Sequence, residues 1–124
     1  MKTNRKQVHA KYGGRCGYCG KEIKPEDMQI DHLHPKVFGG GDDISNLMPA
    51  CGECNNYKYN YSLEQFRGYL EGVYDFLAKT QKLRIAERLG VFERKSNEIR
   101  FYFEIYKSER TGREGDGLQK MDVK

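Results

Sequence analysis

Apolar positions change their spacing along the chain, and each spacing predicts a different element. The basic segment 3–12 carries apolar residues four positions apart and stops at two glycines, which predicts a short helix. Alternation over Met28–His32 predicts a short strand, and Ile44–Met48 is long enough for a second one. A glycine-rich loop over residues 38–43 would join these strands, and a helix should begin near Cys51. The predicted order is strand, strand, helix.

The second half of the chain predicts helices followed by a hairpin. One helix is expected over residues 63–78, and a second is expected over residues 81–89. Residues 91–106 are predicted to form a β-hairpin turning at Ser96-Asn97, because Ile99–Tyr106 alternates in the way a half-buried strand does. Residues 108–124 have few apolar positions and are expected to be disordered. The apolar face of the first helix would be formed by Leu63, Phe66, Leu70, Val73 and Leu77.

Composition limits what these elements can build. With 124 residues, of which 37% are hydrophobic and 32% charged, the chain fits one domain with a modest core. We expect that domain to cover residues 1–107, with its core at 15–61 and an extension at 62–107. No apolar run is long enough to span a bilayer, and the basic start is not followed by the apolar segment of a signal peptide. These features predict a cytoplasmic protein without a membrane segment.

Four cysteines occur as two CxxC pairs, Cys16 with Cys19 and Cys51 with Cys54. In a reducing compartment two such pairs favour a zinc site over disulfides. A pair of disulfides in a secreted protein, or four incidental thiols, are the alternatives. The 31 residues between the pairs exceed the length found in an ordinary zinc ribbon, so we expect the insert to be functional.

Charge is distributed unevenly along the chain. Residues 1–20 hold five basic residues and no acidic one, whereas residues 21–60 hold seven acidic and four basic ones. A basic flank beside a locally acidic centre suits a protein that binds a polyanion through its backbone and keeps carboxylates for a cation. Asp31 and Asn55 offer hard oxygen ligands for such a cation, and His32 offers a proton acceptor. Two different ions are therefore implied, one soft and one hard.

Residues 15–58 combine the two cysteine pairs, Asp31-His32 with Pro35 three residues on, the glycine loop, and the segments Asn46-Leu47 and Cys54-Asn55-Asn56-Tyr57-Lys58. In this combination they resemble the HNH endonucleases of the ββα-metal class. The separations between the motif residues are also similar to those in the HNH domain of CRISPR effector nucleases. The fold class implied is α+β: a small ββα-metal nuclease core with a four-cysteine zinc site, flanked by an N-terminal helix and by C-terminal helices plus a β-hairpin.

The resemblance also implies a role for each motif residue. His32 would be the general base that takes a proton from the attacking water, a task that suits an imidazole near neutral pH. Asp31 and Asn55 would hold one divalent cation at the scissile phosphate, and the amide of Asn46 would tie the loop together. The products would carry 5′-phosphate and 3′-hydroxyl ends, as in the family.

One motif position departs from most members of the family. The last motif residue is usually histidine and is Asn55 here, so the chain is an HNN variant. CRISPR HNH domains resemble the chain in this respect, so activity is still expected. An amide oxygen is a harder ligand than imidazole and should favour magnesium or manganese over zinc or nickel.

Several residues have less specific interpretations. His34 could contact a phosphate or the metal, but a structural role is equally compatible with its position. Lys58 is equally compatible with a phosphate contact and with a solvated face. Three neighbouring tyrosines could stack on bases, but aromatic packing around a small zinc core is the commoner reason for such a cluster. The tyrosines are Tyr57, Tyr59 and Tyr61.

The sequence therefore predicts a zinc-stabilised endonuclease that cleaves DNA, most naturally double-stranded DNA, as nicks or double-strand breaks. The competing interpretation is a non-catalytic zinc-ribbon module that binds nucleic acid or a partner protein. The set of Asp31, His32 and Asn55 separates the two, because a binding module has no need of it. A homodimer, or phage or host protein partners, would fit the small size of the chain and the phages and mobile elements in which the family is common.

Overall fold

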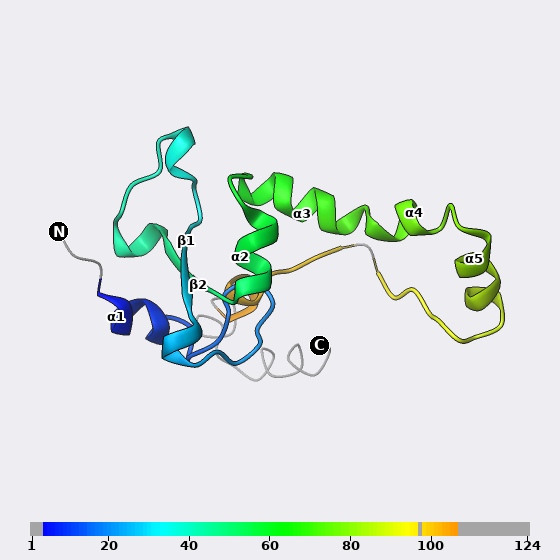
Figure 1. Cartoon of the computed structure of the whole chain (residues 1–124), viewed down its shortest axis with the longest axis horizontal. Coiled ribbons are helices and arrows are strands. Elements are labelled where there is room, and N and C mark those ends of the chain that lie inside the picture. The colour runs from blue at the N-terminus through cyan, green and yellow to red at the C-terminus, as the bar shows by residue number, and fades with distance from the viewer. Residues whose placement is uncertain (1–3, 97, 107–124) are drawn as a thin grey trace. The chain divides into compact units, whose positions relative to one another are not determined.

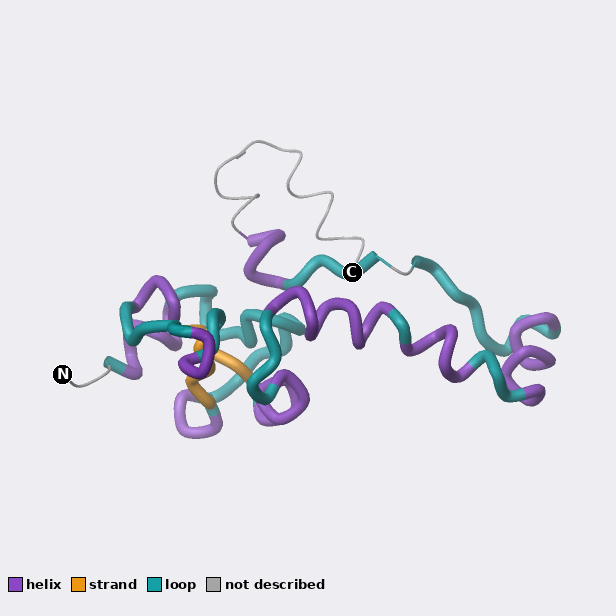
Figure 2. Tube along the Cα trace, turned by 90° about the horizontal axis from the view of Figure 1, so that it is seen from above, coloured by secondary structure: helices purple, strands orange, loops and turns teal. Residues whose placement is uncertain are grey.

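The computed structural model describes residues 4–96 and 98–106 (Figure 1). The chain divides into two compact units: Met1–Leu63 with Arg100–Lys124, and Glu64–Ile99. The disorder expected over residues 108–124 lies outside the described residues. Among the described residues, none of the helices combines the length and apolar character needed to cross a membrane. Figure 2 shows how little of the first unit is strand and how much is loop.

The first helix, α1 (Arg5–Ala10), lies inside the segment predicted to be helical. Asn4 caps it by accepting a hydrogen bond from the backbone nitrogen of Gln7 at 3.1 Å. Val8 is fully buried and anchors the helix in the core. The helix is followed by Gly13 and Gly14, whose positive φ angles of 68° and 81° suit glycine.

Two short strands form an antiparallel hairpin beside the next helix. β1 (Gln29–His32) pairs with β2 (Leu47–Ala50), so that Asp31 lies opposite Met48. Figure 1 shows α1 and α2 on either side of this hairpin. Because every residue of β2 is buried, this strand forms the centre of the unit.

The second strand begins later than the sequence suggested. Ile44–Asn46 is a 3-10 turn, η3, in which the backbone nitrogen of Asn46 donates to the carbonyl of Asp43 at 2.7 Å. The strand prediction over Ile44–Met48 was therefore wrong for its first three residues. The buried apolar run starts only at Leu47, which explains the shift.

Helix α2 (Gly52–Lys58) follows β2 directly and completes the predicted strand, strand, helix order. Cys51 caps it, with its sulfur accepting from the backbone nitrogen of Cys54 at 3.4 Å. Two further 3-10 turns, η1 (Pro25–Asp27) and η2 (Lys36–Phe38), flank β1. The mixed α+β core predicted from the sequence is confirmed.

The second unit is helical. The helix predicted over residues 63–78 is interrupted at Gly72 and forms α3 (Leu63–Glu71) and α4 (Val73–Leu77). α5 (Gln81–Arg88) agrees with the prediction and ends before Gly90, which has a φ of 84°. Of the predicted apolar face only Phe66 is buried; the residues that are exposed instead are Leu70, Val73 and Leu77.

The hairpin predicted over residues 91–106 was wrong. Among the described residues of this segment none is in a strand, and residues 102–106 are helical. The predicted turn partly falls on Asn97, which lies outside the described residues. Glu104 explains the helix, because its carboxylate accepts from the backbone nitrogen of Phe101 at 2.8 Å and so caps the first turn.

The alternating aromatic residues of this segment pack on the first cysteine knuckle instead of on a second strand. Phe101 and Phe103 are both buried, and their ring centroids lie 5.5 and 6.3 Å from that of Tyr18. The backbone nitrogen of Phe103 donates to the carbonyl of Gly17 at 2.8 Å. The end of the chain's described part therefore belongs to the core of the first unit.

Candidate functional site

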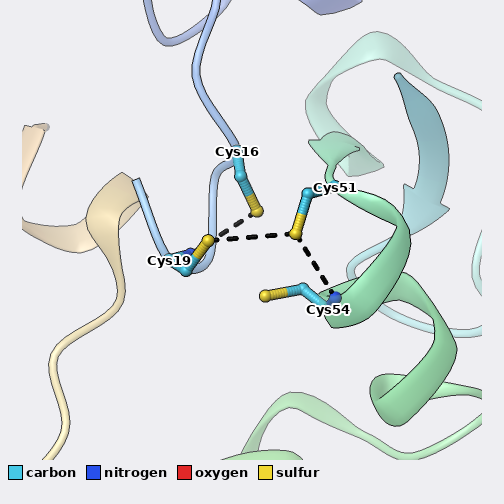
Figure 3. A group of neighbouring side chains, drawn as sticks. All are labelled: Cys16, Cys19, Cys51 and Cys54. Atoms are coloured by element: carbon cyan, nitrogen blue, oxygen red, sulfur yellow. Dashed lines mark hydrogen bonds between the residues drawn. The ribbon is translucent and has the colours of Figure 1, made fainter. Parts of the chain in front are cut away.

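The four cysteines form one cluster (Figure 3). Their sulfur atoms all lie within 4.8 Å of one another, and the sulfurs of Cys19 and Cys51 are 3.9 Å apart. Tetrahedral zinc with Zn–S bonds of about 2.3 Å separates its sulfurs by about 3.8 Å. All four thiols are free, and two come from the knuckle before β1 while two come from the start of α2. The cluster could hold a metal ion such as zinc, as the two CxxC pairs predicted.

The charge state of the cluster is consistent with a cation site. A hydrogen bond from Cys54 lowers the pKa of Cys16 to about 4, and this same bond raises the pKa of Cys54. Burial raises the pKa of Cys19 to about 11. Backbone nitrogens of Tyr18 and Cys19 also point at the Cys16 sulfur, at 3.4 and 3.5 Å. Without a cation the thiols share protons, and a divalent ion would release them.

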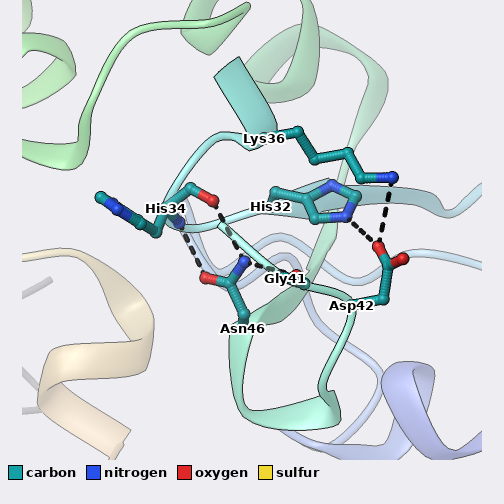
Figure 4. A network of polar contacts seen from close by, with 6 residues as sticks. All are labelled: His32, His34, Lys36, Gly41, Asp42 and Asn46. Carbon is teal, nitrogen blue, oxygen red and sulfur yellow. Dashed lines mark hydrogen bonds and ion pairs between the residues drawn. The ribbon is translucent and has the colours of Figure 1, made fainter. Parts of the chain in front are cut away.

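His32 stands at the end of β1 and faces the glycine-rich loop (Figure 4). Its Nε2 lies 2.8 Å from Oδ1 of Asp42, and the Lys36 ammonium lies 3.6 Å from that same oxygen. The hydrogen bond to His32, followed by the charge of Lys36, lowers the pKa of Asp42. Asp42 could not be predicted as a site residue, since one acid among two adjacent ones in a loop carries no distinctive spacing.

Asn46 joins the two ends of this loop. Its Oδ1 accepts from the backbone nitrogen of His34 at 2.8 Å, and its Nδ2 donates to the carbonyls of His34 and Gly41 at 3.1 and 2.8 Å. The backbone of Leu33 adds a further hydrogen bond, to the carbonyl of Asn46 at 2.9 Å. The amide thereby fixes the backbone just after His32. The His34 side chain is exposed, and Figure 4 shows its ring pointing away from His32.

Asp31 lies on the buried side of β1, where it contacts two other buried groups. The hydroxyl of Tyr18 donates to its Oδ2 at 2.6 Å, and the ammonium of Lys58 lies 3.1 Å from the same oxygen. Burial and the charge of Asp31 raise the pKa of Tyr18. Within the described part of the chain, both side-chain contacts of Asp31 fall on Oδ2, and Oδ1 accepts from no residue.

Lys58 is placed differently from either sequence expectation. Instead of lying on a solvated face or reaching a phosphate, it is fully buried. Its ammonium also donates to the carbonyl of His32 at 3.0 Å. One side chain of α2 therefore holds Asp31 and the backbone of His32 together from behind.

Asn55 lies on α2, away from these contacts. Its Nδ2 donates to Oε1 of Gln29 at 3.4 Å, and no polar contact joins it to Asp31 or His32 among the described residues. It lines a shallow hollow on the surface with residues from β1 and α2. The other lining residues are Gln29, Gly52, Glu53, Asn56 and Tyr57.

The tyrosines after Asn55 are mostly on the surface. Tyr57 and Tyr59 are 71% and 69% exposed, so the prediction that they pack around the metal site was wrong for both. Tyr59 is edge-on to Tyr61, with ring centroids 6.4 Å apart. The rings packed near the first cysteine pair are those of Tyr18, Phe101 and Phe103 instead.

The sequence of this region is similar to that of known proteins. The family model for HNH endonuclease matches residues 16–61. A curated protein of Bacillus subtilis (strain 168), named "SPbeta prophage-derived putative HNH endonuclease YoqL", is 30% identical over 102 residues. That alignment covers 72% of this chain and 42% of the relative, so the chain spans less than half of that protein's length. The chain therefore carries an HNH endonuclease domain at residues 16–61.

Proposed function

We propose that this protein is a metal-dependent endonuclease that hydrolyses the phosphodiester bonds of double-stranded DNA, with His32 as the general base and one magnesium or manganese ion. The observation that carries the proposal is the position of His32. It ends β1 of an HNH domain, directly after Asp31, and its side chain is 25% exposed. A base in that position can be reached by water and by a phosphate, as general base catalysis requires.

The ligands proposed for the catalytic cation are Asp31 and Asn55. Asp31 keeps Oδ1 available because its neighbours bind Oδ2. Asn55 donates through Nδ2, and its Oδ1 accepts from no group among the described residues. Both are the hard oxygen donors that magnesium and manganese prefer. When bound, the ion neutralises the charge that develops on the phosphate oxygens.

The other motif residues would position these groups. Asn46 fixes the loop backbone after His32, and Lys58 fixes the carbonyl of His32 together with the carboxylate of Asp31. A structural zinc ion in the cysteine cluster would join the knuckle to the start of α2 and so hold that helix against the hairpin. His34, with its exposed ring, is a candidate for a contact with the DNA phosphates.

The alternative is a zinc-ribbon module that binds nucleic acid or a protein without cleaving anything. Such a module needs the four cysteines, but it gains nothing from a partly exposed histidine next to a buried carboxylate with one unused oxygen. The HNH match favours the enzyme over the module.

The setting proposed for this activity is a phage or mobile element acting in the cytoplasm. The Bacillus subtilis relative is named as prophage-derived, which supports this setting. A single site cuts one strand, so double-strand breaks would need a homodimer, a second binding event or another phage or host protein.

The test is incubation of the zinc-loaded protein with supercoiled plasmid, with magnesium or with a chelator. We expect nicked circles, or linear DNA, only when magnesium is present. A radiolabelled duplex then shows whether the new ends carry 5′-phosphate and 3′-hydroxyl groups. The contrary result is retardation of DNA in a gel without cleavage of duplex DNA, single-stranded DNA or RNA. That result would support the binding module and contradict the nuclease.

A further inference from the structure

The contact between His32 and Asp42 joins two separate segments. His32 ends β1, whereas Asp42 lies in the glycine-rich loop, and the separation of 2.8 Å between Nε2 and Oδ1 is that of a strong hydrogen bond. The Asp42 side chain is 65% exposed, against 25% for His32. Figure 4 shows the carboxylate at the edge of the imidazole ring, with the Lys36 ammonium beside the same carboxylate oxygen.

The chemistry of the two groups decides which nitrogen carries the hydrogen. Because His32 and Lys36 lower the pKa of Asp42, its carboxyl group is ionised at neutral pH. An ionised carboxylate only accepts hydrogen bonds, so Nε2 of His32 must be the donor. A neutral imidazole with hydrogen on Nε2 has its lone pair on Nδ1. Within the described part of the chain, Nδ1 of His32 makes no hydrogen bond.

Hydrogen bonds at the residues just before Asp42 hold this part of the loop in place. Asn46 binds the carbonyl of Gly41, and the backbone nitrogen of Gly40 donates to the carbonyl of Pro35 at 3.0 Å. A side chain at Gly40 would place its Cβ 1.7 Å from the carbonyl oxygen of His34, so only glycine fits there. The backbone before Asp42 is therefore closely packed against the segment that follows His32.

We propose that Asp42 is a positioning residue for the base, fixing the hydrogen of His32 on Nε2 and leaving Nδ1 as the nitrogen that takes the proton. This role rests on the proposed function. As water attacks, its proton goes to Nδ1, its oxygen bonds to phosphorus and the P–O3′ bond breaks. The departing oxygen takes a proton from solvent, and the imidazolium later returns its own proton to solvent. The Asp42 carboxylate stabilises the imidazolium in between.

The kinetic test compares Asp42→Ala with Asp43→Ala under saturating magnesium. Asp43 is the matched control, since it is an adjacent exposed acid of the same loop whose side chain makes no capping bond. Asp42→Ala should lower kcat about tenfold or more. This loss is part of the ~10²–10⁴-fold rate enhancement that a positioned general base contributes. Its KM should not rise, because removing an acid favours DNA binding in both variants. Asp42→Asn, which keeps a neutral acceptor, should recover part of kcat.

The second test measures the hydrogen position directly, by ¹⁵N NMR of the histidine rings in zinc-loaded protein without magnesium. The His32 signals are identified by their loss in His32→Gln, at a pH well above the ordinary histidine pKa of about 6.5. The wild type should show hydrogen on Nε2 and a bare Nδ1. Asp42→Ala should show a mixture of both tautomers, and Asp43→Ala should match the wild type.

The outcomes separate this inference from the proposed function. A wild type that cleaves no nucleic acid overturns the nuclease and the catalytic role of Asp42 with it, while the NMR signals still report on the hydrogen bond. Unchanged kcat in Asp42→Ala, in a wild type that does cleave, overturns the positioning role alone. Faster cleavage by Asp42→Ala also overturns it, because Asp42 would then be blocking the base. Hydrogen on Nδ1 in the wild type overturns the tautomer assignment.

Discussion

The cysteine cluster and the loop around His32 lie in the same domain but differ in almost every physical respect. The cluster has two buried sulfur residues, Cys16 and Cys51, and brings together segments 31 residues apart. The loop is mainly exposed, is held by hydrogen bonds of Asn46, and places Asp42 beside His32 at the end of β1. We therefore expect the cluster to hold the chain together and the loop to present polar groups to a ligand.

Stability and chemistry should therefore respond to different substitutions. Asp31 is the exception, because it belongs both to the buried network and to the proposed cation site. Its Oδ2 belongs to a buried network with Tyr18 and Lys58, and its Oδ1 is the oxygen proposed for the cation.

The largest effect is expected from Cys51→Ser, which removes one sulfur from the cluster. Structural zinc contributes on the order of 10 kcal/mol of apparent folding free energy in small zinc peptides. The variant should lose zinc and unfold, as measured by elemental analysis and circular dichroism. Wild-type protein treated with a strong chelator is the control and should give the same spectrum. A folded, zinc-free Cys51→Ser protein would show that the cluster is not structural.

A smaller loss of stability is expected from Lys58→Ala, which leaves the carboxylate of Asp31 buried without its cation. Breaking a buried ion pair costs about 3–5 kcal/mol. Urea denaturation should show this loss. The double variant Asp31→Asn with Lys58→Met should recover much of it, because both charges are then gone, yet it should not cleave DNA.

The matched control for the buried pair is an exposed one. Arg15 and Glu22 form an ion pair at 3.4 Å with side chains 42% and 82% exposed. Glu22→Ala should cost less than about 1 kcal/mol. If Lys58→Ala and Glu22→Ala cost the same, the buried network contributes nothing special to the fold.

His32→Ala tests the loop without touching the core. Removing the proton acceptor should lower the cleavage rate by ~10²-fold or more. Zinc content and the thermal unfolding midpoint should stay near the wild-type values, since the ring is partly exposed and only its backbone binds Lys58. Plasmid nicking at the wild-type rate would remove His32 from the mechanism.

The sequence predicted best what depends on local spacing. The two CxxC pairs can reach one ion only if the chain folds back, and the strand, strand, helix order does this. The position of His32 at a strand end followed from the alternation before it. These features are encoded within a few residues, so a pattern can detect them.

What the sequence could not predict depends on partners distant along the chain. The burial of Lys58 follows from Asp31, and nothing in the spacing of a lysine indicates that it is paired inside the core. Alternation at Phe101 and Phe103 fits a strand, but a helix start capped by Glu104 buries the same two rings. Asp42 was missed because only the fold brings it to His32.

The smallest and most specific effect concerns the choice of metal at Asn55. If its amide oxygen is a ligand, Asn55→Ala should weaken magnesium binding, so that activity falls most at low magnesium and partly recovers at high concentration. Asn55→His offers a softer nitrogen donor and restores the commoner family motif. It should gain relative activity with nickel, cobalt or zinc. The measurement is a metal titration of plasmid cleavage for each protein.

The control for this series is Asn56→Ala, because Asn56 is the exposed neighbour of Asn55 on the same helix and lines the same hollow. Folding and zinc content must be checked for all variants, since Asn55 adjoins Cys54, one of the four cysteines of the candidate zinc cluster. A metal dependence that is the same in wild type, Asn55→Ala and Asn55→His would mean that Asn55 is not a ligand. A shift in Asn56→Ala alone would transfer the role to Asn56, and no shift in any of them would leave His34 as the better candidate. A change of metal dependence confined to the Asn55 variants would show that the two regions also bind different metals. The cysteine cluster would then hold a soft ion, and the site beside the loop would hold a hard one.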